Sequence, residues 1–529
     1  MRRWNGWGDE TVTVALPPRA ISFLTERIGA GTTPRDASFA EALGRVPPPR
    51  IRADGLDANP VSRLAHARGQ SLPDWIALRS GHAAPFPDLV AWPESESDVR
   101  ELIELARRSA ASLIPFGGGT SVLGQVNPLA GSRPSISVDL SRLSVLKSLD
   151  VRSHLATFGA GVRGPDLEAA LRAHGFTLGH FPQSFEHSTL GGWVATRSCG
   201  QQSLGYGRIE RLFAGGRMET PAGPFDLPVF PASAAGPDLR EIVLGSEGRL
   251  GILTEATVRV SSLPEREEFL ALFFAEWEAG LTATRAIAQA RLPLSMLRLA
   301  SPKETEATLV LAGHERSIDM LRRYLRIRLK GETRCLLLAS LTGRRSVVRS
   351  ARRELLALSR SHGGVFVGTA LGEEWRRSRF RAPYLRNALW EAGYAVDTLE
   401  TAVPWSALPS LHASVESALG EGLRDIAERV HVFSHLSHLY ADGSSLYTTY
   451  LFRLVEDPDE NLRRWRHLKA AASRAIVEAR GTISHQHGVG VDHLPYLGAE
   501  KGPLGLAALG SICRQFDPEG LMNPGKLVP

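Results

Sequence analysis

Three short stretches rich in glycine and hydroxyl residues constrain the fold of this 529-residue chain more than any other feature. The first, residues 115–124, reads Pro-Phe-Gly-Gly-Gly-Thr-Ser-Val-Leu-Gly and follows an apolar run at 112–114 that predicts a buried strand. Consecutive glycines allow positive φ, so several backbone N–H groups can point at one anion, usually a phosphate or pyrophosphate. The stretch lacks the Lys of a Walker A loop and the spacing of G-x-G-x-x-G. Taken alone, the stretch would favour an ordinary tight turn after a strand.

Two further stretches repeat this composition. Residues 181–193 contain Ser-Thr-Leu-Gly-Gly-Trp before a predicted helix, and residues 244–251 read Leu-Gly-Ser-Glu-Gly-Arg-Leu-Gly before a predicted strand at 252–260. Glycine-rich turns at the start of a helix commonly receive anions. Three such turns are difficult to explain as unrelated surface loops. One extended ligand with a pyrophosphate, a ribityl chain and a flat ring system would use all of them.

Length and composition limit the class of protein. A chain of 529 residues predicts two or three domains, and 43% hydrophobic with 22% charged residues is typical of a soluble globular protein. Only three cysteines occur, far apart, which argues against a disulfide framework and predicts a reducing, cytoplasmic location. The net charge of +6 comes from scattered arginine. That distribution suits anionic small molecules or an acidic membrane surface, whereas nucleic-acid binding would require a dense basic stripe.

The pattern of breakers and periodic segments predicts four regions. Residues 1–84, rich in Pro and Arg, are expected to wrap a larger body, and residues 85–262 carry the glycine turns. Within that region, Ser95 and Asp98 form a helix-start signal, and Pro165 is well placed in a first helical turn. Strands and helices alternate over 263–460, which predicts a separate α+β domain. Residues 461–529 form a C-terminal segment.

The glycine turns resemble the FAD-binding domain of the vanillyl-alcohol-oxidase superfamily. Four other stretches make the chain most similar, over nearly its full length, to the alkylglycerone-phosphate synthase family. They are Trp-Asn-Gly-Trp-Gly at 4–8, Pro-Asp-Leu-Val at 87–90, Glu-Thr-Ala-Val-Pro-Trp at 400–405 and Ser-His-Gln-His-Gly-Val-Gly at 484–490.

The resemblance implies a fold and a reaction. The expected fold is α+β, with a two-part FAD-binding domain of the vanillyl-alcohol-oxidase type at 85–262, an α+β substrate-binding cap at 263–460, and a segment at 461–529 that returns to the FAD site. The family exchanges the acyl chain of acyl-dihydroxyacetone phosphate for a long-chain fatty alcohol, forming an ether without net redox change. The resemblance also implies a homodimer. The scattered arginine allows peripheral contact with a membrane surface as well.

Carried over by position, the resemblance predicts the residues that contact FAD. The family has an acidic residue where this chain has Gln183, but an amide can still bond a ribityl hydroxyl. The first glycine turn contains no His, so we expect non-covalent FAD. The predicted contacts are Pro115, Phe116, Gly117, Gly118, Gly119, Thr120, Ser121, Gln183, Ser184, Phe185, Glu186, His187, Ser188, Thr189, Thr196, Arg197, Ser198, Cys199, Glu247, Gly248, Arg249, Leu250, Gly251, Ile252 and Leu253.

The resemblance also predicts catalytic residues. Tyr447 stands where the family has its acid/base tyrosine, although a phenol of pKa ~10 serves as a base only if a nearby cation lowers its pKa. Arg386 matches a substrate-binding arginine whose planar fork could hold the phosphate or polarise the acyl group. Arg298 matches another family arginine. Either arginine could instead be an ordinary surface residue.

The segment 485–487 departs from the family, which has three consecutive histidines there. In an extended segment His485 and His487 would face the same way and share the site. Gln486 can donate or accept a hydrogen bond but cannot take up a proton near neutral pH. If the middle position transfers protons, this chain would be slow, altered in specificity or inactive as a synthase.

Two other functions remain open from the sequence. The tail at 516–526 is similar to that of FAD-dependent 2-hydroxy-acid dehydrogenases, and Gln486 alone supports a catalytically impaired flavin- or lipid-binding protein. Those dehydrogenases bind metal through a Glu at the position of Gln486 and a His near the position of Tyr447. We therefore expect no metal, although five histidines could suggest one: His431, His435, His438, His485 and His487.

Overall fold

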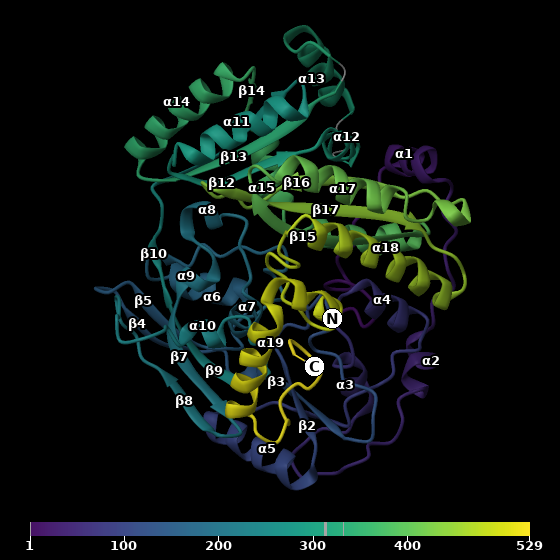
Figure 1. Cartoon of the computed structure of the whole chain (residues 1–529), viewed down its shortest axis with the longest axis vertical. Coiled ribbons are helices and arrows are strands. Elements are labelled where there is room, and N and C mark those ends of the chain that lie inside the picture. The colour runs from purple at the N-terminus through teal and green to yellow at the C-terminus, as the bar shows by residue number, and fades with distance from the viewer. Residues whose placement is uncertain (1, 312–314, 332, 529) are drawn as a thin grey trace.

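The computed structural model describes residues 2–311, 315–331 and 333–528. Its largest element is a seven-stranded sheet in which every neighbouring pair is antiparallel. Figure 1 shows this sheet across the upper half of the molecule. The strand order is β14 (Val365–Gly368), β11 (Arg266–Phe274), β13 (Cys335–Gly343), β12 (Leu294–Ala300), β16 (His431–Leu436), β17 (Gly443–Arg453) and β15 (Tyr394–Pro404).

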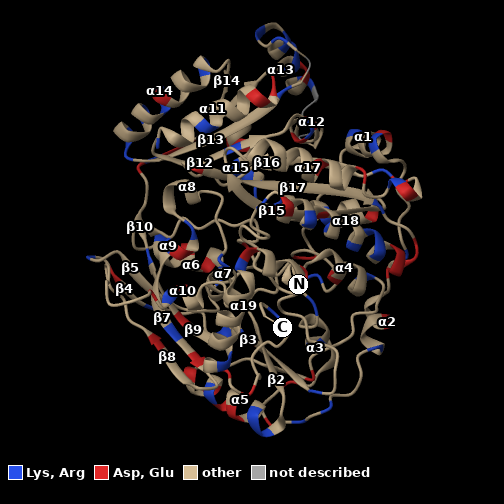
Figure 2. Ribbon diagram, viewed as in Figure 1, with Lys and Arg blue, Asp and Glu red and all other residues tan. Residues whose placement is uncertain are grey.

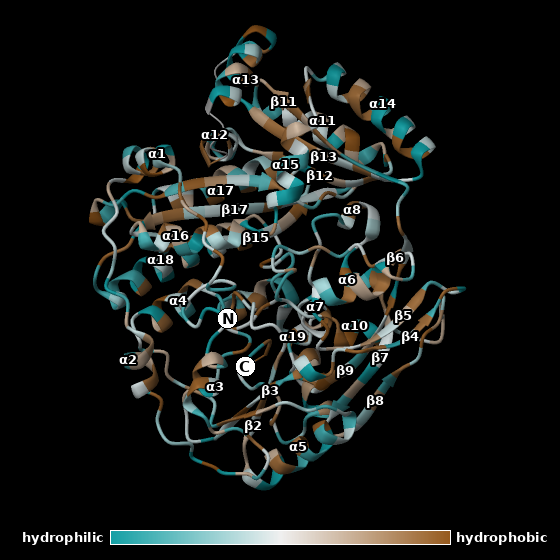
Figure 3. Cartoon of the chain, turned by 180° about the vertical axis from the view of Figure 1, so that it is seen from behind, coloured by the Kyte–Doolittle hydropathy of each residue, from teal (hydrophilic) through white to brown (hydrophobic). Residues whose placement is uncertain are grey.

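Helices cover both faces of this sheet. Helices α11 (Trp277–Gln289), α14 (Arg345–Ser361) and α17 (Leu408–Gly420) pack on its outer face, and α18 (Pro458–Glu478) packs on α17. Helices α12 (Pro302–Leu311), α13 (Glu315–Arg328) and α15 (Ala370–Ser378) lie on the opposite face. Because both faces are covered, β11 and β13 carry continuous apolar runs, which appear brown in Figure 3.

Smaller sheets form the other half of the molecule. Their ends position the glycine turns, because the turn at 115–124 directly follows β2 and that at 244–251 directly precedes β9. The sheets are a parallel one of β1 (Leu89–Ala91), β3 (Ser135–Asp139) and β2 (Ser112–Phe116), an antiparallel one of β4 (Leu146–Asp150), β5 (Leu155–Gly159), β9 (Ile252–Arg259), β7 (Phe213–Thr220) and β8 (Gly223–Leu227), and a pair of β10 (Ser261–Ser262) and β6 (Phe176–Thr177).

The two helix-start signals predicted in this half are confirmed. Ser95 and Asp98 form a reciprocal capping box at the start of α5 (Glu96–Ser109), and Pro165 lies in the first turn of α6 (Gly164–Arg172). The second glycine turn leads into α7 (Leu190–Thr196), as predicted. The remaining α-helices are α1 (Pro18–Ile28), α2 (Phe39–Gly44), α3 (Pro60–Ala65), α4 (Leu72–Arg79), α8 (Ser203–Tyr206), α9 (Ile209–Leu212), α10 (Arg240–Val243), α16 (Leu385–Glu391) and α19 (Leu497–Phe516).

The described segments near both ends of the chain lie at the centre of the molecule (Figure 1). The backbone N–H of Trp7 donates to the Asn387 side chain, whose amide donates back to the Trp7 carbonyl, both at 3.1 Å. Near the C-terminus, Leu113 of β2 exchanges backbone hydrogen bonds with Leu521 and Asn523. The ends therefore hold the two halves around the space between them. Within the described ranges, no helix is long and apolar enough to cross a bilayer.

Candidate active site

One cavity of about 790 Å³ lies between the seven-stranded sheet and the glycine turns. All three predicted turns line it, through residues such as Gly117, Thr189 and Gly248. The C-terminal segment reaches it as well, because Asn523 is part of the wall. The sequence-based inference that three distant turns face one ligand is therefore consistent with the fold.

The first turn has the donors that a pyrophosphate requires. Across the described ranges, the backbone N–H groups of Gly118, Gly119, Thr120 and Ser121 have no hydrogen-bond partner in the protein. A Cβ on Gly118 would lie 1.8 Å from the His187 carbonyl oxygen, so this turn packs directly against the second one. Several unpaired N–H groups at one glycine turn form an anion-binding nest. This wall fits the pyrophosphate of FAD.

Not every predicted cofactor contact lines the cavity. The other predicted contacts are directed elsewhere: Arg197, for example, pairs with Glu241 at 2.8 Å on the exposed surface, and the His187 ring packs edge-on against Trp7. The predicted contacts that are not part of the cavity wall are Phe185, Glu186, His187, Arg197, Arg249, Leu250 and Ile252.

Tyr447 lies on the cavity face of the seven-stranded sheet. Its register partners across the sheet are Glu400 on β15 and His435 on β16, so three chemically useful side chains emerge in one row. The Tyr447 hydroxyl donates to the Gln183 amide oxygen at 3.4 Å. Burial raises the pKa of this phenol above its ordinary value of about 10, and the nearby Arg386 offsets this only in part. Tyr447 therefore holds its proton at neutral pH, which differs from the expectation that a neighbouring cation activates it.

Arg386 lies at the cavity wall, and part of its guanidinium has no hydrogen-bond partner among the described residues. Its guanidinium lies 4.4 Å from the ring centroid of Trp75, and Nη1 donates to the Gln70 carbonyl oxygen at 2.7 Å. The other terminal nitrogen, Nη2, is buried and has no hydrogen-bond partner among the described residues. A buried, unsatisfied guanidinium nitrogen beside a cavity is well suited to bind an anionic or carbonyl oxygen of a substrate.

Arg298 is already neutralised. Its guanidinium forms an ion pair with Glu304. Nδ1 of His435 donates to Glu304 at 2.8 Å, and Nη2 of Arg298 lies 3.1 Å from the same nitrogen. These charges hold the pKa of Glu304 at about 2 against the effect of burial. Arg298 lines the cavity, but its charge is paired with Glu304, and its catalytic role stays a prediction.

The segment 485–487 is bent rather than extended, so the expected alternation does not occur. Gln486 and His487 line the cavity, whereas His485 is directed behind the wall. There, Nε2 of His485 accepts a hydrogen bond from Arg208 at 2.7 Å, and the Tyr440 hydroxyl lies at the same distance. His485 thus contacts the site through other residues, and its predicted catalytic role would be indirect.

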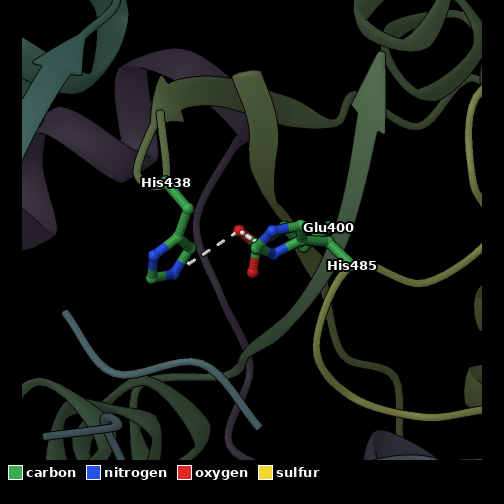
Figure 4. Close-up of side chains that lie close together, drawn as sticks. All are labelled: Glu400, His438 and His485. Carbon is green, nitrogen blue, oxygen red and sulfur yellow. Dashed lines mark ion pairs between the residues drawn. The ribbon is translucent and has the colours of Figure 1, made fainter. Parts of the chain in front are cut away.

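Glu400, His438 and His485 form the single group with metal-ligand spacing in the described part of the chain (Figure 4). Glu400 lies 3.3 Å from Nδ1 of His485 and 3.8 Å from Nε2 of His438. Because Arg208 can only donate, Nε2 of His485 must be an acceptor, which places the proton on Nδ1, facing Glu400. A metal would need that nitrogen's lone pair and would have to displace its proton. The absence of a metal stays a prediction.

Several residues of the site escaped the sequence analysis. Glu400 stands out in the sequence only as part of the Glu-Thr-Ala-Val-Pro-Trp stretch, and Arg208, which contacts His485, has no local sequence signal. Cys199, predicted as a cofactor contact, lies 3.2 Å from Nδ1 of His438, and burial raises its pKa to about 12, so it is a thiol. Arg208 and Cys199 are far in sequence from the histidines that they contact, and sequence periodicity predicts only local structure.

The part of the cavity beyond Tyr447 is apolar. One side of its wall comes from residues just before and within α1, another from α12 and α15, and the floor from the sheet. The N-terminal contribution was unexpected, because this segment has no catalytic motif. The apolar wall residues include Val14, Leu16, Phe23, Leu24, Met296, Leu309, Val310, Leu336, Leu338, Leu371, Phe433 and Leu451.

Comparisons with known proteins agree with this architecture. The family "FAD binding domain" matches residues 87–225, and "FAD linked oxidases, C-terminal domain" matches residues 263–527. The alkyldihydroxyacetonephosphate synthase of Dictyostelium discoideum is 29% identical, covering 100% of this chain and 93% of that protein. The enzyme of the same name from Caenorhabditis elegans is 30% identical, covering 99% and 95%.

A solved structure of alkyldihydroxyacetonephosphate synthase superposes with a TM-score of 0.84 at 27% identity, covering 99% of both chains. The α+β fold, the FAD-binding domain and the use of FAD by an enzyme are therefore shown. The chain belongs to the alkyldihydroxyacetonephosphate synthase family of FAD-linked enzymes.

Proposed function

We propose that this protein exchanges the acyl chain of acyl-dihydroxyacetone phosphate for a long-chain alcohol, forming an ether and releasing a fatty acid. The observation that carries the proposal is the position of Tyr447, Arg386 and His487 between the cofactor turns and an apolar wall. One cavity thus contains an arginine that can bind a phosphate ester, side chains that can transfer a proton, and an apolar wall that can contact alkyl chains. The 2-hydroxy-acid dehydrogenase alternative is not favoured, because the full-length relatives are synthases.

Two polar residues have different roles in this proposal: Arg386 binds the substrate, and Tyr447 transfers a proton. Bound FAD would supply a ring system that holds the dihydroxyacetone phosphate carbon during the exchange. Arg386 binds the substrate through Nη2, its unpaired nitrogen. Tyr447, which is protonated, donates a hydrogen bond or a proton to substrate oxygen, and recovers the proton afterwards.

The exchange reaction needs no external acid or base, because the protons lost and gained by its substrates and products are equal in number. The alcohol must lose one proton as its oxygen forms the ether, and the released carboxylate can carry that proton away. His487 lies beside Tyr447 with ring centroids 6.3 Å apart, and burial lowers its pKa below 6.5. It is therefore a neutral imidazole at pH 7 and can accept the alcohol proton.

The proposal is tested by incubating the FAD-loaded protein with acyl-dihydroxyacetone phosphate and radiolabelled hexadecanol. We expect a labelled ether lipid that withstands alkaline hydrolysis. Tyr447→Phe should abolish most of this product, whereas Tyr496→Phe, which changes a tyrosine outside the cavity wall, should not. Absence of ether lipid from a wild-type protein with full flavin content would contradict the proposal.

We further propose that α13 rests on an anionic membrane surface. Ile318, Leu325 and Leu329 face the protein, whereas Met320, Tyr324 and Ile327 form an exposed stripe at i, i+4 and i+7. The same helix carries Arg316, Arg322, Arg323, Arg326 and Arg328, and α13 shows blue segments in Figure 2. An apolar stripe between basic residues is typical of helices that lie in a membrane interface. The neighbouring α12 lines the apolar part of the cavity, so a chain could pass between membrane and site.

Sedimentation with lipid vesicles tests this contact. Ile327→Ser should weaken binding to vesicles containing phosphatidylserine, and Leu504→Ser serves as a matched control because both side chains are 83% exposed. Equal binding by both variants would contradict the assignment of α13.

The domain boundaries at 84, 262 and 460 and the homodimer stay predictions. The sheets support the second and third boundaries, since all seven strands of the largest sheet lie within residues 266–453. The oligomeric state is open to sedimentation velocity, which should give twice the monomer mass of 57.4 kDa.

A further inference from the structure

Gln486 is held by a buried carboxylate in a way that fixes its orientation. Its amide contacts Glu400, which also accepts a hydrogen bond from the Ser437 hydroxyl at 2.8 Å. Glu400 is fully buried and remains a carboxylate, so it can only accept hydrogen bonds. The NH₂ end of the Gln486 amide must therefore face Glu400. This assignment follows from the chemistry of the carboxylate and does not depend on how the amide atoms are labelled.

The carbonyl end of the same amide is left to the cavity. Gln486 is part of the cavity wall, and among the described residues none donates a hydrogen bond to its Oε1. Glu400 is the register partner of Tyr447 across the sheet, so this acceptor lies beside the predicted proton-transfer group. The site thus presents a fixed hydrogen-bond acceptor next to Tyr447 and His487.

Only one of the two proposed substrates can use such an acceptor. Acyl-dihydroxyacetone phosphate carries an ester, a ketone and a phosphate dianion, all of which accept hydrogen bonds. The fatty alcohol carries one O–H donor. The inference below rests on the proposed function for this pair of substrates.

We propose that the carbonyl oxygen of Gln486 receives the hydroxyl of the fatty alcohol, and that Glu400 is the positioning residue that turns this oxygen toward the cavity. This contact holds the alcohol oxygen beside His487. Because the alcohol has a single O–H, the hydroxyl turns from Gln486 to His487 before the imidazole takes its proton. A neutral histidine at position 486 would do the same, donating one N–H to Glu400 and presenting the lone pair of its other nitrogen. The replacement of the family's histidine by glutamine therefore preserves an acceptor and removes only the ability to titrate.

The test separates binding from turnover. Calorimetric titration of FAD-loaded protein compares 1-dodecanol with dodecyl methyl ether, which has the same chain but no O–H donor. Wild type should bind the alcohol about fivefold more tightly, as one net hydrogen bond to a neutral acceptor provides. Gln486→Met should remove this preference, and Gln486→His should keep it. Glu400→Gln should reduce it, because the amide at 486 can then reverse. Gln201→Met, which changes another glutamine of the cavity wall, is the matched control.

Each result of the titration either supports or contradicts the assignment of Gln486 as the acceptor for the alcohol. An alcohol preference that survives in Gln486→Met, or that disappears in Gln201→Met, would overturn the assignment. Lower FAD affinity in Gln486→Met with an unchanged alcohol preference would place the amide against the cofactor instead. A wild-type protein that binds neither probe would contradict both the inference and the apolar chain site. Normal alcohol preference without any ether synthesis would leave the contact standing and refute the proposed reaction.

Discussion

The imidazole of His435 stacks on the phenol ring of Tyr447, with ring centroids 4.8 Å apart and 18° between the ring planes. The two residues are register partners on β16 and β17. His435 in turn donates a hydrogen bond to Glu304, the partner of Arg298 in a buried ion pair. The sheet therefore connects the proposed acid/base residue to a fixed charged cluster, which leaves Tyr447 little freedom to reorient.

Removing the Tyr447 hydroxyl should impair chemistry and little else. Tyr447→Phe keeps the ring stacked on His435, so we expect normal folding and FAD content. Turnover should fall by roughly 10²- to 10⁴-fold, the usual contribution of general acid–base catalysis. Steady-state kinetics at matched flavin occupancy measures this. Unchanged turnover would refute the assignment.

The activity should be nearly independent of pH above neutrality. Burial lowers the pKa of His435 and His487 below 6.5, so both imidazoles gain protons only in more acidic solution. The raised pKa of Tyr447 keeps its proton in place on the alkaline side. We expect kcat/KM to be flat from about pH 7 to 9 and to decline below about 6.5. An ionisation near pH 8 that is lost in Tyr447→Phe would show that substrate or cofactor lowers the phenol pKa.

Arg386 and Arg298 should respond differently to substitution. Arg386→Lys keeps the charge but loses the planar fork that binds Gln70 and stacks on Trp75. It should raise the KM for acyl-dihydroxyacetone phosphate by tenfold or more and leave FAD binding unchanged. A normal KM would place the phosphate elsewhere.

Arg298→Met should act mainly on stability. It leaves Glu304 as an uncompensated buried carboxylate, which typically costs about 3–5 kcal/mol. Urea unfolding should show this loss, and adding Glu304→Gln should recover most of it. Full stability in the single variant, accompanied by a large rise in KM, would indicate that Arg298 serves the substrate.

Gly118 in the first glycine turn should tolerate no side chain. In Gly118→Ala the new methyl group would collide with the His187 carbonyl, and the unpaired N–H groups would lose their arrangement. We expect purified Gly118→Ala to contain much less FAD than wild type, by absorbance and by heat release of the cofactor. Gly44→Ala is the control, because nothing lies within 4 Å of a Cβ there. Equal FAD content in both variants would contradict the placement of the pyrophosphate.

Elemental analysis tests the prediction that no metal is bound. We expect no stoichiometric zinc or manganese and no effect of chelators on activity, since Nδ1 of His485 carries a proton toward Glu400. A stoichiometric metal that disappears in His438→Ala would reverse this conclusion and favour the dehydrogenase alternative.

The sequence predicted those parts of the fold and site that depend on local chemistry. The glycine turns, the strand before Gly117 and the capping box at Ser95 are all encoded within about ten residues, and the structure contains each of them. The site residues beyond them depend on strand register. Glu400 meets Tyr447 and Gln486 only because β15 and β17 pair in one particular alignment.

Other features escaped prediction for the same reason. The chain is bent at 485–487, where His485 contacts Arg208, nearly 280 residues away, and so the expected alternation of His485 and His487 was wrong. The apolar wall contributed by residues 14–24 also depends on how the N-terminal segment packs on the sheet. Sequence periodicity carries no information about such long-range contacts.

The most direct test of the central claim is the fate of the alcohol oxygen. FAD-loaded protein is incubated with acyl-dihydroxyacetone phosphate and ¹⁸O-labelled hexadecanol, without any redox partner, and the products are analysed by mass spectrometry. An exchange predicts one ether lipid containing ¹⁸O for each unlabelled fatty acid released, with the flavin oxidised before and after. Bleaching of the flavin by a 2-hydroxy acid, with no labelled ether from the acyl substrate, would contradict it.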